Sequence, residues 1–309
     1  MRSNAKRWLT GFAVVLATMA VAVPAAAVTP VATAAPVTHR TVFATKGGTL
    51  YRLALSSTGA VTASTPVAGG TNSVASDYDG ARLAFVRQGA PDWRDDQVWV
   101  REAAGESRFL AMGHLGTFTP ERTGVTIARY VMVGRDPDSM DPHHDELSVY
   151  RLADGHVLPL SPHADAYSDL RMRNSHDGKN LWMLTLFLGE SDHPMKRYDR
   201  ATDTITRSFN WPELWQCGDV EILPSGANAL FACGSRLLTM RLDTGAITHS
   251  SPLPAGTTAT ALDGRLNIQT LLLSMSSGSR RSLAALDLTT MRIRTLAGSA
   301  GYTDAVAAY

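Results

Sequence analysis

Lysine is scarce in this 309-residue sequence, which has 29 lysines and arginines but only four lysines. The formal net charge is +1, so no basic field of the kind that attracts nucleic acid is present. After the first residues, no apolar run is long enough to cross a bilayer. The G-x-S-x-G motif of serine hydrolases and the H-E-x-x-H motif of zinc peptidases are also absent. Nothing so far indicates a nucleic-acid-binding protein, a later membrane span or an enzyme of these two classes.

Cysteine is almost as rare, with only Cys217 and Cys233. The segment between them is typical of a strand, a Pro-Ser-Gly turn and a second strand, and both cysteines are equally far from Ser225. We therefore expect them to face each other across a hairpin and to form a disulfide, which export from the cytoplasm permits. Two buried free thiols are the alternative, because some directly opposed strand positions lie too far apart for a disulfide.

The N-terminus has the pattern of a secretory signal peptide. Arg2, Lys6 and Arg7 precede an apolar run, and Ala25 and Ala27 form an A-x-A cleavage pattern. We expect a signal peptide over residues 1–27 and a flexible leader over 28–38, which predicts a secreted or extracytoplasmic protein. An uncleaved membrane anchor is the alternative, since the apolar run is close to spanning length.

The remainder of the chain repeats a pattern of paired hairpins about every forty residues. Strand-like runs around short polar turns indicate β-hairpins. The first hairpins of the repeats cover residues 72–87, 117–133, 169–187, 219–234 and 258–275. The second hairpins begin at residues 49, 96, 146, 194, 237 and 282. Four strands at this period are the signature of a β-propeller blade.

One first hairpin is missing, and the two ends of the chain are placed to supply it. Residues 302–309 and 39–45 each have the pattern of one strand, and their pairing would close the ring and remove both open edges. We therefore predict an all-β fold with a single domain over 39–309. It is a six-bladed β-propeller with four antiparallel strands in each blade. A seven-bladed ring and an open β-solenoid are the alternatives.

The clearest repeat, "LPLSPHADAYSDLRMRNSHDGKNLWMLTLF" at residues 158–187, resembles the repeats of TolB-like, WD40-like (PD40) propellers. The D-G turn of that family is matched by Asp177-Gly178, by Asp79-Gly80 and by Asp263-Gly264, whereas its Trp-Ser-Pro element is absent throughout. The resemblance implies the propeller fold. It also implies a protein-binding platform in the bacterial envelope or an accessory domain of a peptidase, although fold does not fix function.

Long acidic connections are expected on one face of this ring. In each blade the connection between the second and third strands lies on the same face as the link to the next blade. These connections are long in three neighbouring blades, at residues 88–97, 134–146 and 188–194. They carry Asp92, Trp93, Asp95, Asp96, Asp136, Asp138, Asp141, His143, His144, Glu190, Asp192 and His193. Links between blades add His163, Asp165, Trp211, Glu213 and Trp215 to this face.

The longest of these connections raises the question of a metal site. Asp136, Asp138 and Asp141 have oxygen ligands that suit Ca²⁺, and His143 with His144 would favour Zn²⁺. The spacing does not match an EF-hand loop, and two adjacent histidines on a strand point in opposite directions. A solvated acidic loop is therefore the alternative, and we predict no cofactor, with Ca²⁺ left open.

Three functions follow as hypotheses. The first is a non-catalytic, monomeric binding module whose acidic face, with Trp93, Trp211 and Trp215 as anchors, docks a protein or peptide, such as a cell-envelope component. The second is a lactonase-type hydrolase with Ca²⁺ in its channel, for which the candidate ligands are Asn72, Asp169, Asp219, Glu221 and Asp304. The third is a lectin-like sugar binder. "SHDGKNLW" at residues 175–182 is similar to the sialidase Asp box, but Gly178 follows Asp177 directly, so the match fails.

Overall fold

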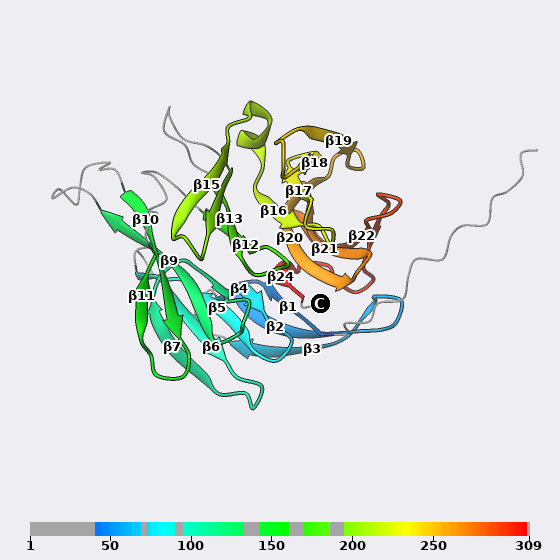
Figure 1. Ribbon diagram of the computed structural model, residues 1–309. Helices are drawn as coiled ribbons and strands as arrows, with labels where there is room; N and C mark the ends of the chain where they lie inside the picture. The colour runs from blue at the N-terminus through cyan, green and yellow to red at the C-terminus, as the bar shows by residue number, and fades with distance from the viewer. Residues whose placement is uncertain are drawn as a thin grey trace, which may run out of the picture. The chain divides into compact units, whose positions relative to one another are not determined.

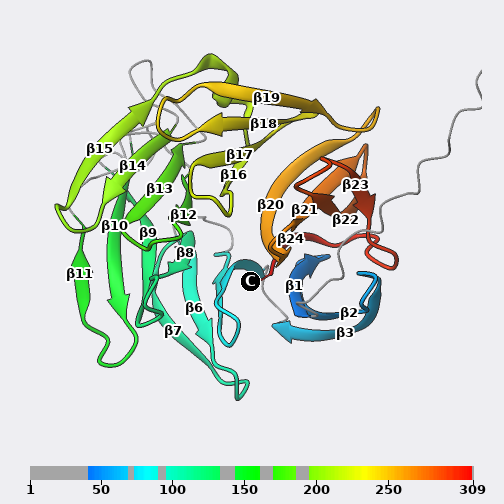
Figure 2. The ribbon, with the colours of Figure 1, turned by 45° about the vertical axis from the view of Figure 1, so that its right-hand side comes forward.

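The computed structural model describes residues 41–68, 73–89, 95–132, 143–160, 170–185 and 195–307. All of these residues belong to one compact unit, Ala35–Tyr309. They form six antiparallel sheets of four strands each, arranged as the blades of a ring (Figures 1 and 2). The predicted six-bladed β-propeller is therefore confirmed. The expected boundaries at residues 27 and 38 lie outside the described residues.

The strands of each blade run from the channel outward in chain order, except in the blade that closes the ring. Blade 1 is β24 (Thr303–Val306), β1 (Thr41–Lys46), β2 (Thr49–Leu55) and β3 (Val61–Ala68). Blade 2 is β4 (Ser73–Tyr78), β5 (Leu83–Arg87), β6 (Gln97–Arg101) and β7 (Ser107–Met112). Blade 3 is β8 (Leu115–Phe118), β9 (Gly124–Met132), β10 (His143–Arg151) and β11 (Val157–Pro159).

The other three blades repeat this order. Blade 4 is β12 (Leu170–Asn174), β13 (Asn180–Thr185), β14 (Met195–Asp199) and β15 (Thr204–Phe209). Blade 5 is β16 (Asp219–Ile222), β17 (Asn228–Cys233), β18 (Arg236–Arg241) and β19 (Ile247–Pro252), preceded by the 3₁₀ helix η2 (Pro212–Gln216). Blade 6 is β20 (Thr258–Asn267), β21 (Thr270–Ser277), β22 (Arg280–Asp287) and β23 (Ile293–Thr295). No helix within the described ranges has the length and apolar character needed to cross a membrane.

Ring closure depends on strands from opposite ends of the chain. β24 pairs antiparallel with β1, and Phe43 lies opposite Val306 while Thr45 lies opposite Thr303. The inner strands contact one another in sequence, from β4 through β8, β12, β16 and β20 to β24 and back to β4. The predicted closing blade is thus confirmed, and the ring has no open edge at its seam.

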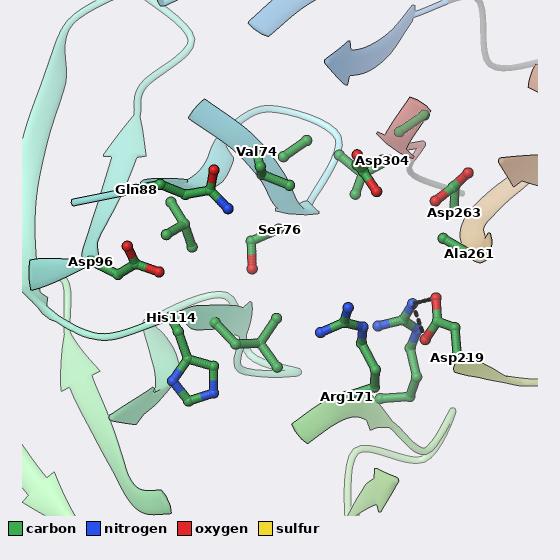
Figure 3. Close-up of a pocket in the computed structure, with 16 residues that line it drawn as sticks. Val74, Ser76, Gln88, Asp96, His114, Arg171, Asp219, Ala261, Asp263 and Asp304 are labelled. Carbon is green, nitrogen blue, oxygen red and sulfur yellow. Dashed lines mark hydrogen bonds and ion pairs between the residues drawn. The ribbon is translucent and has the colours of Figure 1, made fainter. Parts of the chain in front are cut away.

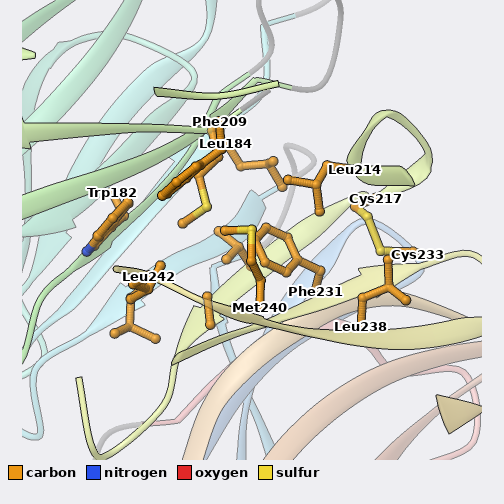
Figure 4. Close-up of a cluster of buried hydrophobic side chains, with 14 residues drawn as sticks. Trp182, Leu184, Phe209, Leu214, Cys217, Phe231, Cys233, Leu238, Met240 and Leu242 are labelled. Carbon is orange, nitrogen blue, oxygen red and sulfur yellow. A yellow bond between two sulfur atoms is a disulfide. The ribbon is translucent and has the colours of Figure 1, made fainter. Parts of the chain in front are cut away.

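Side chains buried between neighbouring blades form the core. Second strands such as β17 and β21 are buried on both faces, which explains their continuous apolar sequences, whereas the outer strands β3 and β11 are largely exposed. Figure 4 shows the cluster between blades 4 and 5. There the rings of Trp182 and Phe209 stack with their centroids 6.3 Å apart. Burial of each such large side chain stabilises the fold by about 1.5–3 kcal/mol.

The D-G dipeptides prove to have two different roles. Asp79-Gly80 and Asp177-Gly178 lie in turns between first and second strands, as predicted. Asp263-Gly264 was wrongly placed in such a turn, because β20 continues through it to Asn267 and the turn falls at residues 268–269. The register of β20 shifts between Leu262 and Arg265, which marks a bulge.

The bulge allows the end of the chain to approach β20 closely. Gly264 has φ +86°, and a Cβ at this position would lie 2.3 Å from the carbonyl oxygen of Ala307. Only glycine tolerates both the backbone conformation and the contact. The N–H of Ala307 donates to the carbonyl oxygen of Asp263 at 2.8 Å. A turn and a bulge can therefore share the same dipeptide, and only the partner strand distinguishes them.

The two cysteines form the predicted disulfide. Cys217 follows η2, and Cys233 is the last residue of β17. The N–H of Gly218 donates to the carbonyl oxygen of Ala232 at 2.8 Å, which continues the β16–β17 pairing beside the bond. The disulfide thus fixes the link from blade 4 to the first hairpin of blade 5.

We expect replacement of both cysteines by serine to lower the free energy of unfolding by about 3 kcal/mol, because the bond closes a loop with a sequence separation of 16. Urea denaturation of the wild type with and without reductant, beside the double variant, measures the effect. Equal stability of the oxidised wild type and the double variant would contradict a stabilising role.

Candidate functional site

The two faces of the ring differ in the length of their connections. Between second and third strands, blades 2, 3 and 4 have long connections, whereas blades 1, 5 and 6 have two-residue turns. The long connections span residues 88–96, 133–142 and 186–194, and the short ones span 47–48, 234–235 and 278–279. Blades 2 to 4 are neighbours, since β4 contacts β8 and β8 contacts β12. We call this the loop face, and the opposite side, with its tight hairpin turns, the turn face.

Most of the predicted docking residues on the loop face lie outside the described residues. These are Asp92, Trp93, Asp136, Asp138, Asp141, Glu190, Asp192 and His193, and they include all three candidate Ca²⁺ ligands. The same holds for Asn72, His163, Asp165 and Asp169. The loop prediction for residues 134–146 was too long, because β10 already begins at His143 and pairs His143 and His144 with Met132 and Val131 of β9.

The described members of the predicted docking set do not share one environment. Asp95 is exposed, whereas Asp96 is 8% exposed and accepts the N–H of Gly89 at 2.7 Å. Asp96 therefore closes the base of the 88–96 connection and is not part of an exposed acidic surface. Trp211 is 41% exposed and lies beside Gly245 of the β18–β19 turn. A Cβ added to that glycine would be 3.1 Å from the indole nitrogen of Trp211. Trp211 lines neither of the two channel cavities described next. Trp215 lies in η2.

A cavity of about 300 Å³ occupies the channel on the loop face (Figure 3). Gln88, Asp96 and His114 lie on one side of it, and Asp219, Asp263 and Asp304 lie on the other, with the Arg171 side chain between the two groups. A second cavity of about 250 Å³ occupies the channel on the turn face. The two cavities share Ser76, Arg173, Asp263 and Val306, so these residues form the waist of the channel.

Arg173 is the centre of this waist. Its Nη2 donates to both carboxylate oxygens of Asp219, at 3.0 and 3.2 Å, and its Nε donates to Glu221 at 3.2 Å. The same Nη2 lies 2.9 Å from the carbonyl oxygen of Leu262. One guanidinium on β12 therefore binds groups on both β16 and β20. Burial alone would lower the pKa of Arg173, but the neighbouring carboxylates, Asp219 first, outweigh it and raise the pKa above its ordinary value.

A second arginine extends the network toward the turn face. Arg265 Nη2 lies 3.3 Å from Glu221 and 2.8 Å from His176 Nε2, and it also donates to the carbonyl oxygen of Ile222. Loss of hydration and the charge of Arg265 lower the pKa of His176, so its imidazole is neutral at pH 7. Glu221 thus lies between two guanidinium groups.

These contacts decide how the channel residues fit a metal ion. Asp219 and Glu221 were candidate Ca²⁺ ligands, but both are ion-paired with arginines. Asp219 also accepts the N–H groups of Val220 and Leu262, at 2.8 and 2.9 Å. Ca²⁺ needs six to eight oxygen ligands that are not already neutralised by a fixed cation. The described channel residues therefore do not fit a lactonase-type Ca²⁺ site, and no three metal-ligating side chains gather anywhere in the described ranges.

Two further carboxyl groups in the channel, one buried and one partly buried, have no ion pair with a described arginine. Asp263 is 4% exposed and accepts the hydroxyl of Ser274 at 2.5 Å. Burial raises its pKa well above 3.8, and the charges of Asp219 and Asp304 add to this, while Ser274 and Arg173 oppose it. Burial also raises the pKa of Asp77, which accepts the hydroxyl of Thr117 at 2.6 Å.

The residues of this network were not recognised in the sequence as a group. A signal was nevertheless present, since Arg171 and Arg173 alternate on β12, the inner strand of blade 4, and so project from the same face. A pair of charges on the channel side of an inner strand requires partners of opposite sign nearby. Asp219, the partner of Arg173, lies 46 residues further along the chain, so only the fold identifies it.

The six four-stranded blades and the charged waist define a six-bladed β-propeller in which ion pairs join neighbouring inner strands of the channel. Among solved structures, the chain is similar to TolB from Acinetobacter baumannii, with a TM-score of 0.65 and 12% identity over 88% of this chain and 67% of that one. It is also similar to a chain of a nidogen/laminin complex, with a TM-score of 0.59 and 10% identity over 83% of this chain and 93% of that one. At these identities the likeness is one of fold, and at that level the predicted resemblance to TolB-like propellers is confirmed. No protein-family model and no curated protein matches the sequence.

The raised pKa of Asp263 predicts how stability depends on pH. The folded protein keeps Asp263 protonated at pH values where the unfolded chain has ionised it, so this group favours folding below pH 3.8 and loses that effect as the pH rises through its folded pKa. We expect the Asp263→Asn variant, which retains an oxygen for the Ser274 hydroxyl, to gain stability relative to the wild type as the pH rises. Urea denaturation between about pH 4 and 7 measures this difference.

The matched control for Asp263→Asn is Asp154→Asn on the exposed β10–β11 turn, where the pKa is lowered by the N–H of His156. The stability difference between this control and the wild type should change little between about pH 4 and 7, because a pKa below 3.8 has most of its effect at lower pH. A difference between Asp263→Asn and the wild type that stays constant with pH would contradict the assignment.

Proposed function

We propose that the protein is an exported, non-catalytic binding module that docks a protein or peptide partner on the loop face. The observation that carries the proposal is the concentration of long connections, at residues 88–96, 133–142 and 186–194, in three adjacent blades on the face where Gln88 and Asp96 line the 300 Å³ cavity. The remaining blades have two-residue turns at the same positions. In proteins built on a rigid scaffold, such connections are the usual carriers of binding residues.

The chemistry of these connections favours a cationic partner. They contain seven acidic residues besides the buried Asp96, two arginines (Arg94 and Arg135) and no lysine, so their net charge is negative. A surface of net negative charge accelerates association with a cationic partner and makes that association sensitive to salt. Trp93 lies among these acids and has the side chain most often found at the centre of a binding interface. A basic segment of a cell-envelope protein would match this composition.

Three observations support a binding role and an extracytoplasmic location. The channel carboxylates Asp219 and Glu221 are held by arginines, so they are poorly suited to act as catalytic acids, bases or metal ligands. A disulfide favours an oxidising compartment. A propeller of similar fold occurs in a structure of a nidogen/laminin complex, so this architecture is compatible with a place in a protein assembly.

The proposal predicts that loss of the loop-face charge abolishes partner binding. The loop variant replaces Asp92, Asp95, Asp136, Asp138, Asp141, Glu190 and Asp192 by the corresponding amides. We expect it to keep the fold, to lose the partners that the wild type captures from an envelope extract at low salt, and to associate with a purified partner roughly tenfold more slowly or worse.

A partial variant and a control matched in charge separate the loop face from general electrostatics. The partial variant changes Asp136, Asp138 and Asp141, and the control changes the exposed turn-face residues Glu106, Glu121 and Asp154. The partial variant should weaken capture and the control should not. Equal capture by the wild type and the full loop variant, or equal losses in the partial variant and its control, would exclude docking through these connections.

A further inference from the structure

A third cavity, of about 360 Å³, lies between blades 4 and 5 on the turn face, beside the turn-face channel cavity, with which it shares His176. Its volume falls in the range of small-molecule sites, roughly 300–1,000 Å³. One wall comes from the failed Asp-box match, residues 175–182, which contributes Ser175, His176, Asp177, Asn180 and Trp182. The other wall comes from Arg197 of β14 and from the turns at residues 225–227 and 242–243 of blade 5. The cavity therefore opens between two blades on the turn face, and none of its lining residues belongs to the long connections of the loop face.

The indole N–H of Trp182 is the feature of this cavity that points to a ligand. Trp182 as a whole is 3% exposed. Its indole nitrogen has no hydrogen bond to another described residue, and it is not among the buried unpartnered polar atoms of the described ranges. The N–H is therefore open to the cavity, where water or a ligand can accept it. Figure 4 shows the indole nitrogen at the end of the ring that points away from the buried cluster. Since Trp182 lines the cavity, a molecule held there is a natural acceptor.

The faces of the Trp182 ring are already in use, so a ligand would meet only its edge. Phe209 stacks on the ring, and the guanidinium carbon of Arg197 lies 5.9 Å from its centroid. Trp99 in blade 2 provides the contrast. It is also covered by aromatic neighbours and an arginine, but its N–H donates to Gln97 at 3.1 Å. The fold thus satisfies one indole donor internally and presents the other to a cavity.

The other polar groups of the cavity supply both donors and acceptors. Arg197 uses its Nε for Thr206 at 2.9 Å, which leaves its two terminal nitrogens as donors. Asp177 uses Oδ1 for Ser175 and for the N–H of Lys179, which leaves Oδ2 as an acceptor. The side-chain amide of Asn180 has no hydrogen bond to another described residue, and it can donate and accept. A ligand for this set needs several groups that each donate and accept.

Neighbouring hydroxyl groups on a sugar ring have this property, because each hydroxyl is both a donor and an acceptor. We infer that the cavity between blades 4 and 5 binds a saccharide, with Trp182 and Arg197 donating to its oxygens and with Asp177 and Asn180 accepting from its hydroxyls. This site goes beyond the proposed docking function and lies on the other face of the ring. An experiment that disproves the saccharide site therefore leaves the proposed docking surface untouched, and the reverse also holds.

The indole N–H signals of the ¹⁵N-labelled protein test the inference directly. The Trp182 signal is assigned as the one that is missing in Trp182→Phe. We expect it to shift in a saturable manner on titration with at least one of glucose, galactose, mannose, N-acetylglucosamine and their disaccharides. The Asn180→Ala variant should bind that sugar about two- to tenfold more weakly, which corresponds to one lost hydrogen bond. The matched control Trp99→Phe should bind as the wild type does.

Two outcomes of these titrations would overturn the inference. The cavity binds no saccharide if none of these sugars shifts the Trp182 signal. The site is elsewhere if a sugar binds with equal affinity to the wild type, Trp182→Phe and Asn180→Ala. If Trp182→Phe does not fold, Asn180→Ala and Arg197→Gln decide the question, since both side chains lie at the cavity rather than in the buried cluster.

Discussion

The centre of the propeller depends on one partly buried guanidinium. Arg173 on β12 binds Asp219 and Glu221 on β16 and the backbone of β20, so three consecutive inner strands meet at one side chain. Removing charges from water costs several kcal/mol for each ion, and their mutual attraction offsets this only when each remaining donor and acceptor is also satisfied. The structure meets much of this condition, because Asp219 accepts two backbone N–H groups in addition to Arg173. The network sets which channel groups remain available for other chemistry.

Arg173, the centre of this network, also lies where the two channel cavities meet. Together with Ser76, Asp263 and Val306, it lines both the cavity on the loop face and the cavity on the turn face. The cavity between blades 4 and 5 forms where two blades pack together, and it shares His176 with the turn-face channel cavity. The proposed docking surface and the proposed saccharide site therefore lie on opposite faces of the ring.

Local sequence pattern predicted the parts of the fold that local physics determines. Hairpin patterns gave the blade count, and the matching strand patterns at the two ends predicted the β24–β1 closure. Cys217 and Cys233 could be paired because a single hairpin lies between them. The Asp263-Gly264 dipeptide was misplaced because a turn and a bulge have the same requirement for glycine, and the approach of Ala307 that distinguishes them comes from the far end of the chain.

The candidate sites were harder to predict, because their interactions also come from distant parts of the chain. The acidic connections could be recognised as a group once the blades were counted, but Asp96 could not be identified as buried, because its partner Gly89 is reached only by the folded course of the connection. Asp219 and Glu221 were recognised as channel residues, but their arginine partners on β12 and β20 are more than forty residues away in sequence. A carboxylate near an inner strand therefore indicates a channel position without indicating whether it binds a metal or an arginine.

The central claim is that a structural ion-pair network joins three consecutive inner strands at the channel waist. A double-mutant cycle on Arg173→Met and Glu221→Gln tests it most directly. The free energy of unfolding of the four proteins is measured by urea denaturation at pH 7. The account predicts that Arg173→Met costs about 3–5 kcal/mol, because it leaves buried carboxylates without their cation, and that adding Glu221→Gln recovers part of this loss. An Arg173→Met variant as stable as the wild type, or strictly additive effects of the two substitutions, would contradict it.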